Sequence, residues 1–190
     1  MFPRFLVIPR LHGTPTSHFF PLELTTTPLG TIRRIPDMET TTPWHAAYPQ
    51  PRNAQPDSLT SAQVLDLLRH RAADDTKAKE NRCVLVDLRR NDHQGGAIRG
   101  SINLPAQSLH PTIPQLYDLF QAAGVQTVIW FCASSKGRGT RAAGWFHDYI
   151  QDRQNSEMKS VVLSGGIKGW VSSGEEYISF MDGYDAASWE

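Results

Sequence analysis

The sequence predicts an α/β fold with a central, mainly parallel sheet flanked by helices. Strand-like apolar runs alternate with helix-like stretches over residues 57–175, and this order is typical of βαβ units. Three of the runs, 83–88, 127–131 and 160–163, are apolar almost throughout. Such continuous runs are expected of strands that are covered on both faces.

The elements follow one another in a regular order. A capping-box pattern at 60–63 and the apolar stripe after it predict a helix over 61–71. The charged stretch 72–82 then predicts a loop. The elements expected after it are a strand at 83–88, a glycine-punctuated loop, a strand at 101–104, a helix at 114–123, a strand at 127–131, a helix at 139–151 and a strand at 160–163.

Composition divides the chain into an extension at 1–56, a domain at 57–175 and a C-terminal extension at 176–190. Ten of the 13 prolines and nine threonines lie in 1–56. Proline fixes φ and removes a backbone donor, so we expect this part to be extended or partly disordered. Within it, Trp44 and Tyr48 predict that 43–52 docks on the domain.

The first 37 residues leave two interpretations open. They carry four arginines against two acidic residues, which is typical of a mitochondrial transit peptide. The prolines argue against an amphipathic targeting helix. The other interpretation is a leader outside the functional protein, with Met38 as the true start.

Charge and cysteine content narrow the class of protein. The formal net charge is zero, which gives no global attraction to nucleic acid or membrane, and no run approaches the roughly 18 apolar residues of a membrane span. Two cysteines are too few for a disulfide framework and indicate a reducing compartment.

We expect the protein to be located in the cytoplasm, the nucleus or both, or in the mitochondrion if 1–37 is a transit peptide. No residues at metal-ligand spacing are visible, so we expect no metal.

The stretch WFCASSKGRGTR, residues 130–141, contains the candidate catalytic residues. Cys132 follows a predicted buried strand and precedes a predicted helix, and ligands bind at the carboxyl ends of strands in open α/β sheets. The intervening loop can form a P-loop-like nest of N–H groups at the helix N-terminus, which favours both a tetrahedral anion and a thiolate. Arg138 can hold two oxyanion oxygens in its fork. The expected oxyanion-binding residues are Ala133, Ser134, Ser135, Lys136, Gly137 and Arg138.

The ordinary alternative is an inert cysteine. A lone cysteine at a strand end is more often a small apolar residue, and we interpret Cys83 in this way. The Cys-X5-Arg spacing between strand and helix favours a nucleophile at Cys132. We therefore expect Cys132 and Arg138 to be the catalytic pair.

Four separated segments resemble the rhodanese superfamily. They are VLVDLR at 84–89, GGAIRGSINLP at 95–105, CASSKGRG at 132–139 and VLSGGIKGW at 162–170. The resemblance implies a rhodanese-like fold with a five-stranded sheet. Its loop length is similar to that of the cell-division-cycle-type dual-specificity phosphatases and the fungal arsenate reductases, whereas sulfurtransferase rhodaneses have a loop one residue shorter.

The resemblance also assigns supporting residues. Asp87 and Arg89 match a structural Asp-X-Arg motif, in which we expect the aspartate to accept N–H groups and the arginine to pair with an acid. Gly165 and Gly166 are expected to let a loop pass close to the site.

The chain departs from the family at three places. Phe131 stands where the family usually has His before the cysteine, which removes one contribution to thiolate stability. The loop contains no acid, so a proton donor would have to be Asp92, His93 or another group. Leu88 stands where the phosphatases have a second cysteine, and Cys83 lies about 13 Å from Asp87 along a strand, too far for that disulfide.

Three function classes follow. The leading one is a cysteine-dependent enzyme on phosphate- or arsenate-type anions: a phosphatase (hydrolase), with a phosphoprotein as one candidate substrate, or an arsenate reductase (oxidoreductase). No resident cofactor is expected, but the resemblance implies glutathione and glutaredoxin as reductants for an arsenate reductase. The alternatives are a sulfurtransferase with a persulfide on Cys132, and a weakly active module that binds a phosphorylated partner, which Phe131 favours. Whether the protein is a homodimer is left open.

Overall fold

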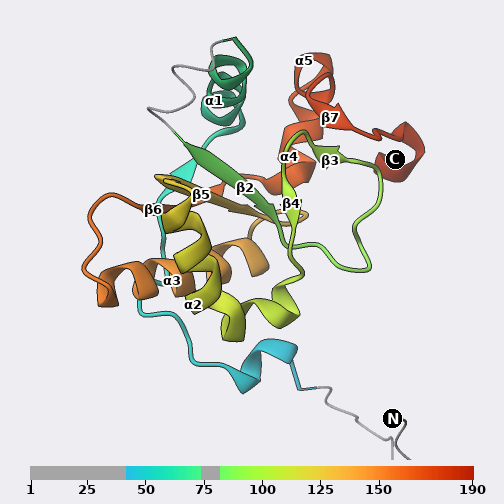
Figure 1. Cartoon of the computed structure of the whole chain (residues 1–190). Helices are drawn as coiled ribbons and strands as arrows, with labels where there is room; N and C mark the ends of the chain where they lie inside the picture. The colour runs from blue at the N-terminus through green and yellow to red at the C-terminus, as the bar shows by residue number, and fades with distance from the viewer. Residues whose placement is uncertain (1–41, 74–81) are drawn as a thin grey trace, which may run out of the picture. The chain divides into compact units, whose positions relative to one another are not determined.

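The computed structural model describes residues 42–73 and 82–190, which belong to one compact unit (Figure 1). The transit-peptide and start-site interpretations of 1–37 and most of the loop predicted at 72–82 lie outside the described residues. No helix of the described part is long and apolar enough to cross a membrane.

A five-stranded sheet forms the centre of the fold, and all its strands run parallel. The order across the sheet is β1 (Ser58–Leu59), β6 (Lys159–Leu163), β5 (Thr127–Phe131), β2 (Cys83–Asp87) and β4 (Ile102–Asn103). β5 lies between β6 and β2, and four of its five residues are buried. The predicted five-stranded, mainly parallel sheet is therefore confirmed, and its three apolar runs are the three central strands.

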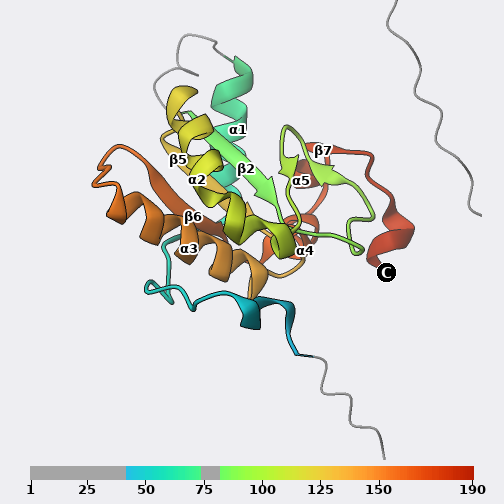
Figure 2. The same ribbon diagram turned by 60° about the horizontal axis from the view of Figure 1, so that its bottom comes forward.

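Two hydrophobic clusters, one on each face, hold helices against this sheet. α2 (Ala106–Ala122) and α3 (Arg138–Asp152) lie side by side on one face and bury Phe120 and Phe146 (Figure 2). α1 (Ser61–Ala73) and α4 (Gly166–Ser172) contribute Val64, Ile167 and Trp170 to the other cluster. The chain also forms the 3-10 turns η1 (Trp44–Ala47) and η3 (Ala186–Trp189) and the short helix α5 (Glu175–Ile178).

The start of α2 was predicted wrongly. The sequence predicted a helix from 114, but the helix begins at Ala106 and contains both Pro111 and Pro114. Pro111 has no N–H to donate to the carbonyl of Gln107. The hydroxyl of Tyr48 donates to that carbonyl instead, at 3.4 Å. A side chain from another segment thus occupies the acceptor that the proline leaves free.

The segment that carries Tyr48 packs along the α2–α3 pair. The rings of Trp44 and Tyr48 meet the ring of Trp145 edge-on, with centroids 6.3 and 5.9 Å apart. The indole N–H of Trp145 donates to the carbonyl of Pro49 at 2.7 Å, and the backbone N–H of Arg52 donates to the carboxylate of Asp148 at 2.6 Å. These contacts bury aromatic surface beside the helix that follows Cys132.

The C-terminal residues return to the domain. β7 (Met181–Asp182) pairs antiparallel with β3 (Ala97–Ile98), and the indole N–H of Trp189 donates to the carbonyl of Gly95 at 2.8 Å. Neither short strand was predicted, because two residues carry no periodic signal. The other predicted elements begin and end within one or two residues of the observed ones.

Candidate functional site

Cys132 lies directly beyond the carboxyl end of the central strand β5. Its neighbour Phe131 is the register partner of Asp87 on β2, and the N–H of Leu88 donates to the carbonyl of Phe131 at 2.8 Å. Cys83 pairs with Thr127 at the opposite end of the same two strands. Both cysteines are free thiols, and burial raises the pKa of Cys83. The geometry thus separates the two sulfurs, as the sequence predicted.

The loop after Cys132 curls around the sulfur. The backbone N–H of Ser135 donates to Cys132 Sγ at 3.3 Å, and the hydroxyl of Ser135 accepts from the N–H of Cys132 at 3.4 Å. Ser135 has a left-handed φ of +57°, which is uncommon for a residue other than glycine, and its carbonyl accepts from the hydroxyl of Thr140 at 2.7 Å. The loop therefore curls back on Cys132, with the N–H group of Ser135 aimed at its sulfur.

The predicted anion-binding residues all belong to this loop and the first turn of α3. Ala133 and Ser134 are half-buried and Ser135 is buried, whereas Lys136 and Gly137 are exposed. Arg138 is the first residue of α3, a helix of 15 residues. The positive end of the helix dipole consequently lies at the loop and favours an anion there.

A second segment fixes the loop from outside. The N–H groups of Ile167 and Lys168 donate to the carbonyls of Cys132 and Ala133 at 3.0 and 2.9 Å. A Cβ on Gly166, whose φ is +61°, would lie 2.4 Å from the carbonyl oxygen of Cys132. Only glycine permits this approach, which is the close passage predicted at Gly166; a Cβ on Gly165 would meet Gly169 instead. The hydrogen bonds from α4 therefore fix the direction of the first two loop carbonyls.

Arg138 is engaged by Asp92 in this structure. Its Nη1 and Nη2 donate to the two carboxylate oxygens of Asp92 at 2.8 and 2.5 Å. The Arg138 hydrogen bonds hold the pKa of Asp92 well below its usual range. The pKa of Arg138 is raised, first by its hydrogen bonds to Asp92 and to a lesser extent by the charge of Cys132. This arrangement speaks against Asp92 as a proton donor while it is paired with Arg138.

Asp87 and Arg89 form a fully buried pair beneath the site. Nε and Nη2 of Arg89 donate to the Asp87 carboxylate, the shortest contact being 2.7 Å, and the backbone N–H of Arg89 donates to the same group at 3.0 Å. Arg89 also donates to the carbonyls of Gln94 and Gly96, which ties down the loop that carries Asp92. The sequence predicted an acidic partner for Arg89, and the structure identifies it as Asp87.

His93, the other candidate donor, lies next to this pair. Its Nε2 is 3.4 Å from Asp87 Oδ2, and its side chain is partly exposed. His93 therefore faces the buried carboxylate, whereas Asp92 faces the guanidinium of Arg138. Of the two, Asp92 is the one in contact with a predicted catalytic residue.

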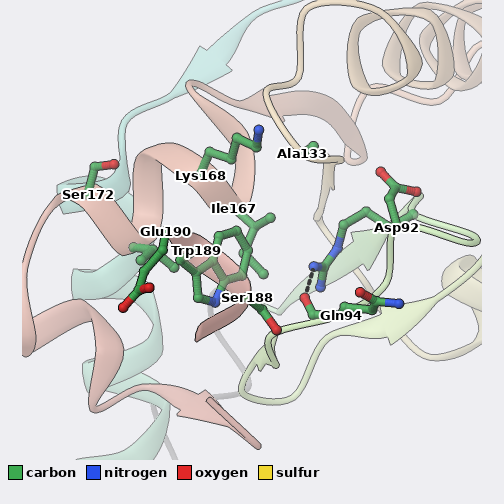
Figure 3. Close-up of a pocket in the computed structure, with 11 residues that line it drawn as sticks. Asp92, Gln94, Ala133, Ile167, Lys168, Ser172, Ser188, Trp189 and Glu190 are labelled. Carbon is green, nitrogen blue, oxygen red and sulfur yellow. Dashed lines mark hydrogen bonds between the residues drawn. The ribbon is translucent and has the colours of Figure 1, made fainter. Parts of the chain in front are cut away.

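A cavity of about 430 Å³ opens beside the loop (Figure 3). Ala133 connects the loop to it, and Asp92 and Lys168 lie on its wall together with Trp189 and Glu190. Sequence reasoning missed Lys168 and Trp189. Lys168 had a signal, since it follows the two glycines of the fourth segment of the resemblance. Trp189 had none, because its contact with Gly95 joins parts of the chain that are far apart in sequence.

Comparison with known proteins agrees with this geometry. A model of the rhodanese-like domain matches residues 68–173. The chain is 29% identical over 119 residues to arsenical-resistance protein 2 of Saccharomyces cerevisiae, over 59% of this chain and 85% of that one. It is 29% identical over 119 residues to arsenate reductase 2.2 of Oryza sativa subsp. japonica, over 61% and 82% of the two chains.

Among solved structures, the fold is similar to that of Saccharomyces cerevisiae Ygr203w, described as a homolog of single-domain rhodanese and the Cdc25 phosphatase catalytic domain. The TM-score is 0.57 at 23% identity, and the match covers 70% of this chain and 91% of that one. At this identity the likeness shows the fold alone.

Proposed function

Because the chain belongs to the rhodanese-like domain family, we propose that it is a cysteine-dependent arsenate reductase. The observation that carries the proposal is the loop at the end of β5, in which the Ser135 N–H points at Cys132 Sγ and α3 begins at Arg138. Such a loop supports a site in which a nucleophile, an anion nest and a guanidinium fork act on one oxyanion. The similar sequences named arsenate reductases support the same class of enzyme.

The proposed first step is attack of the Cys132 thiolate on arsenic. An S–As bond forms, one As–O bond breaks, and that oxygen leaves as water once it has gained a proton. Arg138 holds two of the three remaining oxygens in its fork, and the N–H groups of the loop stabilise the charge on the third. A wide nest suits such a tetrahedral oxyanion better than a single transferred sulfur atom.

The adduct must then be reduced by thiols from another molecule. Arsenic gains two electrons when arsenate becomes arsenite, and two thiols supply them as they form a disulfide. Cys83 cannot act as the second thiol, because it is buried at the opposite end of the β2–β5 pair. We propose glutathione as the external thiol, with glutaredoxin resolving the mixed disulfide.

The second step separates reduction from phosphate-ester hydrolysis. Both reactions begin with attack by Cys132 and need a proton for the oxygen that leaves, so the first step does not distinguish them. Hydrolysis then needs a water molecule to release phosphate from sulfur, whereas external thiols release the product of a reductase. The loop between Cys132 and Arg138 contains no carboxylate that could activate this water, and this absence favours reduction.

The test is arsenate-dependent oxidation of NADPH in the presence of glutathione, glutaredoxin and glutathione reductase. The wild-type protein should turn over, and Cys132→Ser should be inactive. Aryl phosphate and thiosulfate should be assayed beside arsenate. They test for phosphatase and sulfurtransferase activity, respectively. Turnover of only one of these would reassign the enzyme. A wild-type protein that binds phosphate without turning over any of the three substrates would indicate a binding module instead.

A further inference from the structure

The guanidinium proposed to hold the oxyanion is already occupied in this structure. Both terminal nitrogens of Arg138 donate hydrogen bonds to the carboxylate of Asp92. This is the bidentate geometry that the guanidinium would use for two oxygens of arsenate or phosphate. The two uses exclude each other, since each needs the same N–H groups. An oxyanion that binds to Arg138 through this fork must therefore displace Asp92.

Hydrogen bonds fix the backbone of the loop that carries Asp92. Its Oδ1 also accepts the N–H of Arg90 at 3.0 Å, and its loop is fixed by the buried Arg89 through the carbonyls of Gln94 and Gly96. The carboxylate lines the same cavity as Ala133, the first loop residue after the nucleophile. Displacement from Arg138 thus leaves Asp92 beside the bound anion, because the backbone that carries it stays in place.

We propose that Asp92 becomes a proton donor when the substrate binds. In the free enzyme it pairs with Arg138, and the bound oxyanion displaces it from the guanidinium. Asp92 then takes up a proton and passes it to the oxygen that leaves. The inference rests on the proposed function. A tetrahedral dianion carries more charge than a carboxylate, so it competes well for the guanidinium. Asp92 then faces a like charge without its counter-ion, which favours its protonated form.

The other charged groups around Asp92 allow this change. His93 follows it in the same loop but faces Asp87. Across the cavity lie Arg89, which is committed to Asp87, and the side chains of Lys168 and Glu190. Arg138 is therefore the one cation among the described residues that forms an ion pair with Asp92. When Arg138 pairs with the substrate instead, Asp92 loses its positively charged partner.

The proposed step balances for arsenate. The Cys132 thiolate, hydrogen arsenate and protonated Asp92 give the S–As adduct, one water molecule and the Asp92 carboxylate. The S–As bond forms as one As–O bond breaks, and the leaving hydroxide takes the proton of Asp92. The carboxylate is then ready to pair again with Arg138 when the product leaves.

The first experiment measures anion binding with catalysis switched off. Inorganic phosphate is titrated by calorimetry into Cys132→Ser and into the double variant that also carries Asp92→Asn. Loss of the competing carboxylate should tighten phosphate binding by about 1.4- to 5-fold, the range expected for a partly exposed ion pair. The Arg138 side chain is 23% exposed and that of Asp92 44%, which places the pair in this range.

Asp182→Asn is the matched control. It removes another arginine–aspartate ion pair, more exposed and away from Cys132, in which Nε of Arg99, directly after β3, lies 3.0 Å from Oδ1 of Asp182 on β7. It should leave phosphate affinity unchanged. If Cys132→Ser binds no phosphate, the proposed function fails. If it binds phosphate but Asp92→Asn does not tighten it, the function stands and the displacement of Asp92 is refuted.

The second experiment uses the active protein with arsenate. Asp92→Asn should lower both KM and kcat, because it frees the anion site but removes the proton donor. The fall in kcat should be on the order of 10² to 10⁴, the usual contribution of a positioned acid. A purely structural role would not tighten substrate binding while slowing turnover. An unchanged kcat, or a higher KM, would overturn the assignment.

Discussion

The contact between α4 and the loop after Cys132 can be tested with one methyl group. In Gly166→Ala the new Cβ would lie 2.4 Å from the Cys132 carbonyl oxygen and 2.7 Å from that of Ala133. Both atoms belong to the backbone, so α4 must move away. This movement weakens the hydrogen bonds from Ile167 and Lys168, 3.0 and 2.9 Å long, which hold those two carbonyls.

The expected cost follows from these two effects. A left-handed φ costs a residue with a side chain about 1–2 kcal/mol. Each weakened hydrogen bond adds about 0.5–1.5 kcal/mol. The free energy of unfolding should therefore fall by about 2–5 kcal/mol, measured by urea unfolding with tryptophan fluorescence. Phosphate affinity should also fall, because the loop N–H groups lose their fixed orientation.

Gly183→Ala is the matched control. Gly183 has nearly the same φ, +64°, but a Cβ there would meet no atom within 4 Å. The free energy of unfolding of this variant should fall only by the cost of the left-handed φ, about 1–2 kcal/mol, and its phosphate affinity should stay unchanged. If Gly166→Ala proves no more destabilising than Gly183→Ala, the argument that α4 holds the loop is refuted.

Two further predictions concern Arg138 and Cys83. Arg138→Lys should lose most of the arsenate turnover, because a point charge cannot replace a planar fork; near-wild-type kcat/KM in this variant would defeat the assignment. Burial raises the pKa of Cys83, so the folded protein keeps the thiol proton at pH values where the unfolded chain has lost it. The free energy of unfolding should therefore fall as the pH rises past about 8.5, the ordinary thiol pKa. Urea unfolding at both sides of that pH should show this loss in the wild type and a smaller one in Cys83→Ala, and equal losses would contradict the argument.

The parts of the fold that sequence predicted well are those with local signals. The apolar run 127–131 is the observed β5, because a buried strand needs nothing more than continuous apolar character. The curl of the loop after Cys132 was also predictable, since a strand, a short polar loop and a helix follow one another within a few residues. The start of α2 was not, because the group that compensates for Pro111 is the Tyr48 hydroxyl, far away in the chain.

The same limit applies to the electrostatics of the site. Sequence placed Asp92 near the site as a candidate acid and Arg138 as an anion clamp, but not in contact with each other. Their ion pair joins the loop after β2 to the start of α3, and the parallel register of β2 and β5 brings the two together. Spacing along the chain carries no signal for such a pair, which lowers the pKa of Asp92 in the free protein.

The hydrogen bonds from Ile167 and Lys168 to the loop also bear on the synthesis of this protein. They join parts of the chain that are far apart, and contacts of this kind form late in folding. A nascent chain that has not yet reached α4 already contains Cys132 and Arg138, but its loop carbonyls have no donors to turn them outward. Translation therefore produces the thiol before the segment that holds its loop, and the loop gains these two hydrogen bonds only after β6 has joined the sheet and α4 has packed against it.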